Sequence, residues 1–169
     1  MDFVCIAAIS NRQGFLSIFK LISICIYKFT PIPARDIYHN AVRNAIEKDN
    51  WQITKDPFVL KWGTRDLYID LGAEKLIAAE KSGQKIAIEI KSFIGASPIT
   101  DLENALGQYI LYYDILSRLE PDRRLYLAIR QETYSELFQE PIGKILLENQ
   151  RLCLVIFDSK REVILQWIP

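Results

Sequence analysis

The feature that most constrains the fold is a short apolar strand with two charged residues near its end. Residues 86–91, I-A-I-E-I-K, alternate isoleucine with Ala87, Glu89 and Lys91, which is the period-two pattern of a β-strand. This alternation places Glu89 and Lys91 side by side on one face, while the isoleucines pack on the other. Two charges in so apolar a run are costly to bury unless they are paired or bound to a ligand. We therefore expect a functional site at Glu89 and Lys91.

A hairpin is predicted immediately before this strand. Residues 81–84, K-S-G-Q, are a turn signal, and residues 76–80 can pair back as the other arm. Asp70 lies just upstream, where that arm begins. Asp66 competes with it as the first carboxylate, and we prefer Asp70 because it immediately precedes the arm. The simpler interpretation is a surface hairpin with an ordinary Glu–Lys pair, since Glu-x-Lys alone occurs by chance in most proteins.

An Asp before a hairpin, followed by Glu-x-Lys on the next strand, resembles the PD-(D/E)XK nuclease motif. Carboxylates supply the hard oxygen ligands that Mg²⁺ or Mn²⁺ prefers. The metal can activate a water and stabilise charge on a phosphodiester, and an adjacent lysine can orient that water or neutralise the developing charge. The resemblance implies Asp70 and Glu89 as metal ligands and Lys91 as the catalytic lysine.

Hydrophobic periodicity predicts the elements before the hairpin. A helix is expected from Pro33 to Asp49, because proline suits the first helical turn and apolar residues then recur at helical spacing. Residues 51–54 and 58–62 are predicted as separate strands, broken by Asp56-Pro57.

A long helix is predicted after the hairpin, from Thr100 to about Leu119. Thr100 and Glu103 form a capping box at its start. Its expected packing stripe consists of Leu102, Leu106, Tyr109, Ile110 and Tyr113. Gln108 and Tyr112 are four residues apart, so they share another face of this helix.

The last part of the chain predicts a strand, an interrupted helix and a hairpin. The expected ranges are 124–130, 133–148 with a break near Pro141 and Gly143, and the two strands 151–157 and 163–167. The order helix, strands, central hairpin, helix, strand is the α-β-β-β-α-β order of the PD-(D/E)XK core. We therefore expect an α/β, restriction-endonuclease-like core, with a mixed central sheet flanked by helices and a C-terminal β-hairpin.

A second motif follows on the long helix. Gln108 and Tyr112 form a Gln-x-x-x-Tyr pair after the Glu-x-Lys strand, which looks like the additional motif of RecB-like nucleases. This resemblance implies that both residues line the site. The alternative is a helix that carries one polar and one amphipathic residue without a catalytic role.

The first 32 residues differ from the rest of the chain. Phe15–Phe29 is apolar but short for a membrane span, and Lys20 interrupts it. The segment lacks the basic start and the cleavage site of a signal peptide. An amphipathic surface helix and translation assigned from too far upstream are both left open. We expect residues 1–32 to lie outside the folded domain, residues 33–169 to form it, and the protein to be cytoplasmic and not in a membrane.

Several stretches between Pro33 and Pro169 together resemble the cyanobacterial XisH family. They are P-A-R-D-I-Y-H-N-A-V, L-K-W-G-T-R-D-L-Y-I-D-L-G-A-E-K-L-I-A-A-E, I-A-I-E-I-K-S-F, L-G-Q-Y-I-L-Y and P-I-G-K-I-L-L-E-N-Q-R-L. The resemblance implies a factor that controls excision of the fdxN DNA element in heterocyst-forming cyanobacteria. Such a factor works with a small companion, XisI, and a separate site-specific recombinase. Family members typically begin with Met at the position of Ile32.

Two functions are compatible with these patterns. One is a Mg²⁺- or Mn²⁺-dependent DNA endonuclease, in which Glu47 or His39 could join the site, although an exposed helix carboxylate and a structural histidine are the simpler interpretations. The other is a non-catalytic nuclease-fold partner that binds DNA or XisI and regulates the recombinase. The intact Asp70, Glu89 and Lys91 favour the enzyme. The balance of 21 basic and 21 acidic residues favours the partner, since DNA binding needs positive charge. A homo-oligomer is left open.

Overall fold

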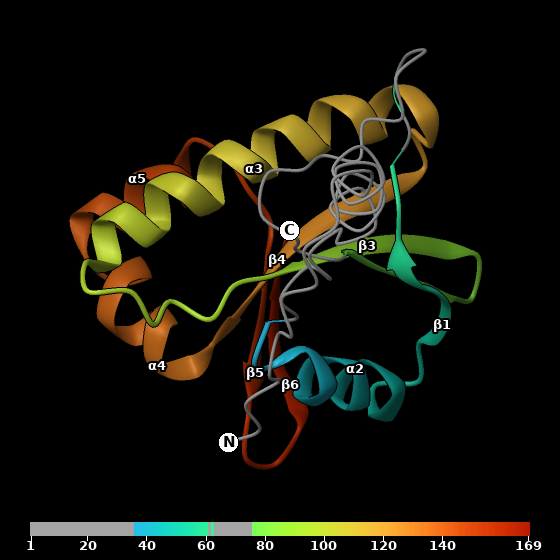
Figure 1. The fold of residues 1–169 in the computed structure, drawn as a ribbon, viewed down its shortest axis with the longest axis horizontal. Helices are drawn as coiled ribbons and strands as arrows, with labels where there is room; N and C mark the ends of the chain where they lie inside the picture. The colour runs from blue at the N-terminus through green and yellow to red at the C-terminus, as the bar shows by residue number, and fades with distance from the viewer. Residues whose placement is uncertain (1–35, 61, 63–75) are drawn as a thin grey trace, which may run out of the picture. The chain divides into compact units, whose positions relative to one another are not determined.

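The structure is a computed structural model, and it describes residues 36–60, 62 and 76–169 of the 169-residue chain. Within these residues the strands of a six-stranded sheet follow one another in chain order (Figure 1). They are β1 (Gln52–Phe58), β2 (Leu76–Lys81), β3 (Gln84–Ile90), β4 (Arg123–Arg130), β5 (Leu154–Asp158) and β6 (Val163–Ile168). The helices are α2 (His39–Lys48), α3 (Pro98–Leu119), α4 (Gln131–Thr133), the π-helical segment η1 (Tyr134–Phe138) and α5 (Pro141–Glu148). None of these described helices has both the length and the apolar character that a membrane span requires.

The sheet is mixed, as predicted. Strands β1, β2 and β3 are antiparallel neighbours, β3, β4 and β5 are parallel, and β6 forms the C-terminal hairpin with β5. The predicted β2–β3 hairpin turns at Ser82-Gly83, where both residues have positive φ. Because parallel strands point the same way, the carboxyl ends of β3, β4 and β5 meet at one edge of the sheet. At that edge the Lys91 N–H donates to the Ala128 carbonyl at 3.1 Å.

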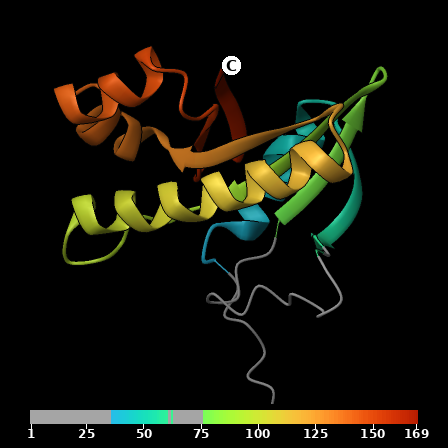
Figure 2. The ribbon, with the colours of Figure 1, turned by 90° about the horizontal axis from the view of Figure 1, so that it is seen from above.

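Each face of the sheet has its own apolar core, with α2 on one side and α3 on the other (Figures 1 and 2). The isoleucines of β3 share a core with Val42 and Ile46 of α2. Ala87 shares the second core with residues of α3, η1 and α5. Glu89 lies on the same face of β3 as Ala87, because alternate residues of a strand point the same way. The predicted separation of Glu89 from the isoleucines is therefore confirmed.

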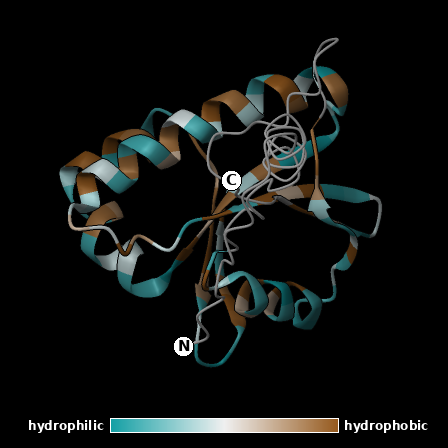
Figure 3. Cartoon of the chain, viewed as in Figure 1, coloured by the Kyte–Doolittle hydropathy of each residue, from teal (hydrophilic) through white to brown (hydrophobic). Residues whose placement is uncertain are grey.

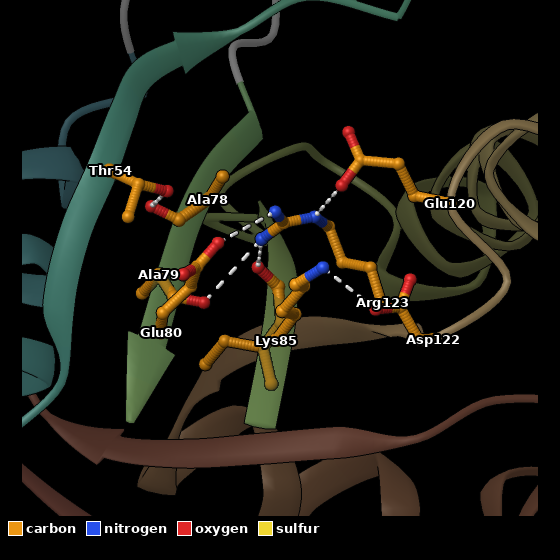
Figure 4. Close-up of polar contacts among 9 residues, drawn as sticks. Thr54, Ala78, Ala79, Glu80, Lys85, Glu120, Asp122 and Arg123 are labelled. Carbon is orange, nitrogen blue, oxygen red and sulfur yellow. Dashed lines mark hydrogen bonds and ion pairs between the residues drawn. The ribbon is translucent and has the colours of Figure 1, made fainter. Parts of the chain in front are cut away.

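Arg123 ties the start of β4 to the β2–β3 hairpin (Figure 4). Its side chain is 4% exposed, and its Nε donates to Glu120 Oε2 at 2.7 Å. One terminal nitrogen donates to the Ile86 carbonyl at 2.9 Å, and the other donates to Glu80 Oε1 at 3.2 Å. The guanidinium also lies over the Phe58 ring, 5.2 Å from its centroid. Each of the three guanidinium nitrogens therefore has an acceptor, and the buried charge stabilises this end of the sheet.

The first strand corrects the prediction of two short ones. A single strand, β1, runs through Asp56-Pro57, whose peptide bond is cis. Proline is tolerated there because β1 is an edge strand, and its pairing with β2 shifts register between Lys55 and Phe58. The predicted strand at 58–62 is wrong: of its described residues, only Phe58 lies in a strand.

Both long helices begin at residues other than those predicted. Helix α2 begins at His39, and the predicted start at Pro33 lies outside the described residues. Helix α3 begins at Pro98, and the Ser97 hydroxyl accepts the Thr100 N–H at 3.3 Å. Ser97 is therefore the N-cap, and the predicted cap at Thr100 is wrong. A proline at the first helical position is consistent with this start, because its φ is already helical and its missing N–H needs no acceptor.

The buried stripe of α3 is rotated relative to the predicted one. Leu102 and Tyr109 are buried as predicted, but Ile110 and Tyr113 are exposed. The buried residues of the helix are Leu102, Ala105, Tyr109, Tyr112, Ile115 and Leu116. Helix α3 carries apolar residues on several of its sides, and Figure 3 shows hydrophobic colour along its length. Periodicity therefore could not decide which apolar side faces the sheet.

The predicted helix at 133–148 consists of separate pieces. Its interruption falls at Gln139-Glu140, and Pro141 then begins α5. The predicted break near Pro141 is therefore confirmed, although Gly143 lies within α5 and does not break it. A Cβ at this glycine would overlap the backbone of Leu137 and Phe138, so the missing side chain allows α5 and η1 to approach closely.

Candidate functional site at the end of β3

Glu89 is fully buried near the end of β3. Among the described residues, neither of its carboxylate oxygens has a hydrogen-bond partner. Burial, with a smaller contribution from the negative charge of Asp36, raises the pKa of Glu89 from 4.5 to about 8. A buried carboxylate without hydrogen bonds costs free energy of folding, so stability does not explain its presence.

Lys91 lies beside Glu89 on the same face. Its Nζ is 3.5 Å from Glu89 Oε1 and donates a hydrogen bond to Gln108 Oε1. Lys91 is 8% exposed, and burial lowers its pKa from 10.5 to about 8, although the charges of Asp36 and Asp101 act in the opposite direction. A buried acid and a buried base with such pKa values can both change charge close to neutral pH.

Helix α3 supplies the next two side chains of the site. Gln108 and Tyr112 are one turn apart and share a face of the helix, as their spacing predicts. Burial raises the pKa of the Tyr112 phenol, and the negative charge of Glu89 adds to the effect. The phenol therefore keeps its proton at neutral pH. Through these contacts Glu89, Lys91, Gln108 and Tyr112 form one group, which joins β3 to α3.

Asp36 also belongs to this group, and the sequence analysis missed it. It lies just before α2, and its charge acts on both Glu89 and Lys91. Its Oδ1 accepts the Tyr38 N–H at 2.8 Å, an Asx-type hydrogen bond that holds the carboxylate in the turn before the helix. An Asp whose side chain can accept the N–H of the residue two positions later is a recognisable local signal. Its electrostatic effect on Glu89 and Lys91 joins parts of the chain that are far apart in sequence, so no local pattern encodes it.

The sequence predicts four more candidate residues for the site, which are Asp66, Asp70, Glu47 and His39. Asp66 and Asp70 both lie outside the described residues. Glu47 is exposed on α2 and its carboxylate lies 3.5 Å from the Nε of Arg43, one turn earlier on the same helix. His39 is buried, and its Nε2 lies 2.9 Å from a carboxylate oxygen of β1. Both side chains are therefore engaged in contacts of their own.

A cavity of about 160 Å³ opens beside Lys91. It is lined by Lys91, Ser92, Phe93, Ile94, Gly95, Asp101 and Asn104. The Gly95 N–H donates to Asp101 Oδ2 at 2.8 Å, which fixes the loop after β3 to the first turn of α3. A Cβ at Gly95 would overlap the Asp101 carboxylate, so a larger residue there would force the Asp101 side chain to move. The cavity gives a small ligand access to Lys91.

The donor set for a metal is partly present. In residues 36–60, 62 and 76–169, no group of three or more His, Cys, Asp or Glu side chains is arranged to hold an ion. Glu89 and Asp36 are carboxylates that interact electrostatically, and hard oxygens of this kind suit Mg²⁺ or Mn²⁺. The orphaned oxygens of Glu89 fit such a cation.

These features define a mixed α/β protein with a buried acid–base pair at one edge of its sheet. The chain belongs to the XisH family, because the family model for XisH protein matches residues 32–165. The resemblance seen in the sequence is confirmed. No curated protein matches the chain.

Two solved structures are similar to this one. An XisH family protein from Nostoc punctiforme PCC 73102 is 43% identical, with a TM-score of 0.72 over 79% of this chain and 100% of that chain. An fdxN element excision controlling factor protein from Anabaena variabilis is 46% identical, with a TM-score of 0.71 over 80% of this chain and 100% of that one. The similarity therefore spans the whole length of both relatives.

Proposed function

We propose that this chain is a DNA element excision controlling factor with a metal-dependent endonuclease site of the PD-(D/E)XK type. The role in excision is supported by family membership and by the Anabaena variabilis relative, an fdxN element excision controlling factor protein. One observation carries the catalytic part. Glu89 is buried 3.5 Å from Lys91, and among the described residues its oxygens have no hydrogen-bond partner. Such a pair costs stability and suggests a ligand that offsets the cost.

Mg²⁺ or Mn²⁺ is the proposed cofactor. Glu89 would hold the ion together with Asp70, which lies outside the described residues. Among the described residues, Asp36 is a further carboxylate whose charge acts on Glu89. When bound, the ion supplies the Lewis acid that phosphodiester hydrolysis needs.

The protein's own side chains have distinct roles in this proposal. Lys91 stabilises the negative charge that develops on the phosphate during hydrolysis. Gln108 accepts a hydrogen bond from its ammonium and thereby orients it. Tyr112 keeps its proton and forms part of the buried wall beside Glu89.

A non-catalytic role is the second candidate. In it, the same fold binds DNA or an XisI-like companion and regulates a site-specific recombinase. The observation that favours it is the balance of 21 basic and 21 acidic residues. DNA affinity depends on neutralising phosphates, and a chain without net positive charge is poorly suited to bind DNA by itself. A companion that adds basic surface would relieve this deficit.

Cleavage assays separate the two candidates. Purified protein is incubated with plasmid and with branched DNA, in Mg²⁺ or Mn²⁺, with and without an XisI-like companion. The endonuclease proposal predicts cleavage by the parent, no cleavage by Glu89→Gln, and unchanged cleavage by Glu47→Gln, whose carboxylate is exposed. A parent that binds DNA or the companion but never cuts it supports the regulatory candidate instead.

A further inference from the structure

We propose that the cavity beside Lys91 binds one unstacked base of a DNA strand, adjacent to the phosphate whose hydrolysis Lys91 assists. The inference rests on the proposed function, from which it takes nucleic acid as the ligand. It adds a preference for DNA with accessible bases, such as single strands and branches, over an intact duplex.

The size and position of the cavity suit a single base. Its volume of about 160 Å³ is well below that of sites for drug-sized ligands, which is roughly 300–1,000 Å³. It therefore admits one ring system and excludes a stacked base pair. Lys91 forms part of its wall, so a base bound there belongs to a nucleotide next to the lysine.

The lining favours a base over a second phosphate. Phe93 and Ile94 supply apolar surface, and Ile94 is 64% exposed, so a flat ring can pack against it. On the α3 side, Asp101 and Asn104 supply a carboxylate and an amide. The carboxylate repels phosphate but accepts hydrogen bonds from the amino groups of cytosine and adenine, and an amide pairs well with adenine. Adenine and cytosine should therefore bind better than thymine, which has no amino group.

The loop that forms the cavity is held in an uncommon conformation. Phe93 has a φ of 49°, in the left-handed region that bulky residues rarely adopt. Its ring packs edge-on against Phe138 at 6.5 Å between centroids, and the Gly95–Asp101 hydrogen bond fixes the next part of the loop. Strain of this kind persists only where surrounding contacts impose it, and it clusters at ligand sites. The cavity is thus preformed.

Binding without metal tests the inference separately from cleavage. Fluorescence anisotropy in EDTA measures the affinity for labelled oligo-dA, oligo-dC and oligo-dT, and for a duplex of equal length. The parent should bind oligo-dA and oligo-dC more tightly than oligo-dT or the duplex. Asn104→Ala should weaken binding to oligo-dA about tenfold, as expected for loss of an amide–base contact. Asn104→Phe should weaken oligo-dA and oligo-dC alike, because the ring fills the cavity.

The control is Ser117→Ala, a neutral and exposed position further along α3, which should leave all affinities unchanged. Asn104 is also exposed, so both of its variants should keep the parent circular dichroism spectrum. Equal affinity for all four probes, no binding to any of them, or Asn104 variants that bind like the parent would each overturn the inference. If one of these results is found but the protein still cleaves DNA, the base-binding proposal is wrong and the endonuclease proposal is not affected. If the expected binding pattern is found but no DNA is cleaved in Mg²⁺, the endonuclease proposal is wrong and the base-binding proposal is not affected.

Discussion

The Nζ of Lys91, the residue that follows β3, lies 3.5 Å from Oε1 of Glu89 in that strand. Both side chains are buried, at an end of β3 that is otherwise apolar. Gln108 binds the same ammonium, so α3 as well as β3 holds the pair in place. The shifted pKa values of this acid and base make both sensitive to pH.

Glu89→Gln should stabilise the metal-free protein at neutral and mildly alkaline pH. The folded-state pKa of Glu89 is about 8, above its ordinary value of 4.5. Its contribution to stability is therefore fully present below pH 4.5 and is lost as the pH rises through 8. The variant, which cannot ionise, should gain on the order of 3 kcal/mol over the parent at the upper end of this window. Urea denaturation in EDTA across the window measures the difference.

The lysine does not obscure this result. The pKa of Lys91 is lowered to about 8, so its contribution is present above 10.5 and lost as the pH falls through 8. Between pH 4.5 and 8 the lysine is mostly charged in both states and adds little slope. Parallel stability curves for parent and Glu89→Gln would contradict the assigned burial of this carboxylate.

Glu89→Ala should abolish binding of Mn²⁺ while the fold persists. The reason is that Glu89 is buried and its oxygens have no hydrogen-bond partner among the described residues. Isothermal titration calorimetry with Mn²⁺ measures the loss. Glu47→Ala serves as the control, since it removes an exposed carboxylate from α2 and should leave the affinity unchanged. Equal affinity in parent and Glu89→Ala would exclude Glu89 as a ligand.

Lys91→Ala should retain metal and DNA binding but cut DNA at least ~10²-fold more slowly, as when one donor to a developing charge is removed. In the proposed function the lysine would act on the transition state and would not hold the metal. Single-turnover cleavage of a labelled substrate measures the rate. Lys144→Ala, which removes an exposed positive charge from α5, should cut like the parent. Comparable rates for Lys91→Ala and the parent would remove the catalytic assignment.

Arg123→Ala should destabilise the fold by about 2–4 kcal/mol. The change leaves the Ile86 carbonyl and two carboxylates without the donor that now satisfies them. Urea denaturation monitored by tryptophan fluorescence measures the loss. Lys85→Ala breaks a surface pair with Asp122 near the same end of the sheet and should change stability little (Figure 4). If the two variants lose equal stability, the contacts of Arg123 with the β2–β3 hairpin do not stabilise the fold as described above.

Ser97→Ala should cost about 1 kcal/mol, the usual value for loss of an N-cap hydroxyl. The Ser97 oxygen accepts the Thr100 N–H at 3.3 Å, whereas the sequence pattern favoured Thr100 as the cap. Thermal or urea denaturation of Ser97→Ala and Thr100→Ala separates the two assignments. A larger loss for Thr100→Ala would restore the predicted capping box.

Local patterns determined the elements that carry the site. Alternation over 86–91 was enough to place Glu89 and Lys91 on one face of a strand, and the turn at 81–84 was enough for the hairpin. The four-residue spacing of Gln108 and Tyr112 was enough to put both on one face of α3. These relationships depend on the geometry of a single element or a single turn, so neighbouring residues encode them.

Only the tertiary structure decided which elements meet. It placed Asp36 where its charge acts on Glu89, and it turned Tyr112 rather than Tyr113 towards the sheet. It also carried β1 through a proline at the sheet edge. Each outcome depends on contacts between residues far apart in the chain. A helix with apolar residues on several sides can pack in more than one orientation. An acid in a turn can face solvent or another element. Only the packing of the whole domain selects one arrangement.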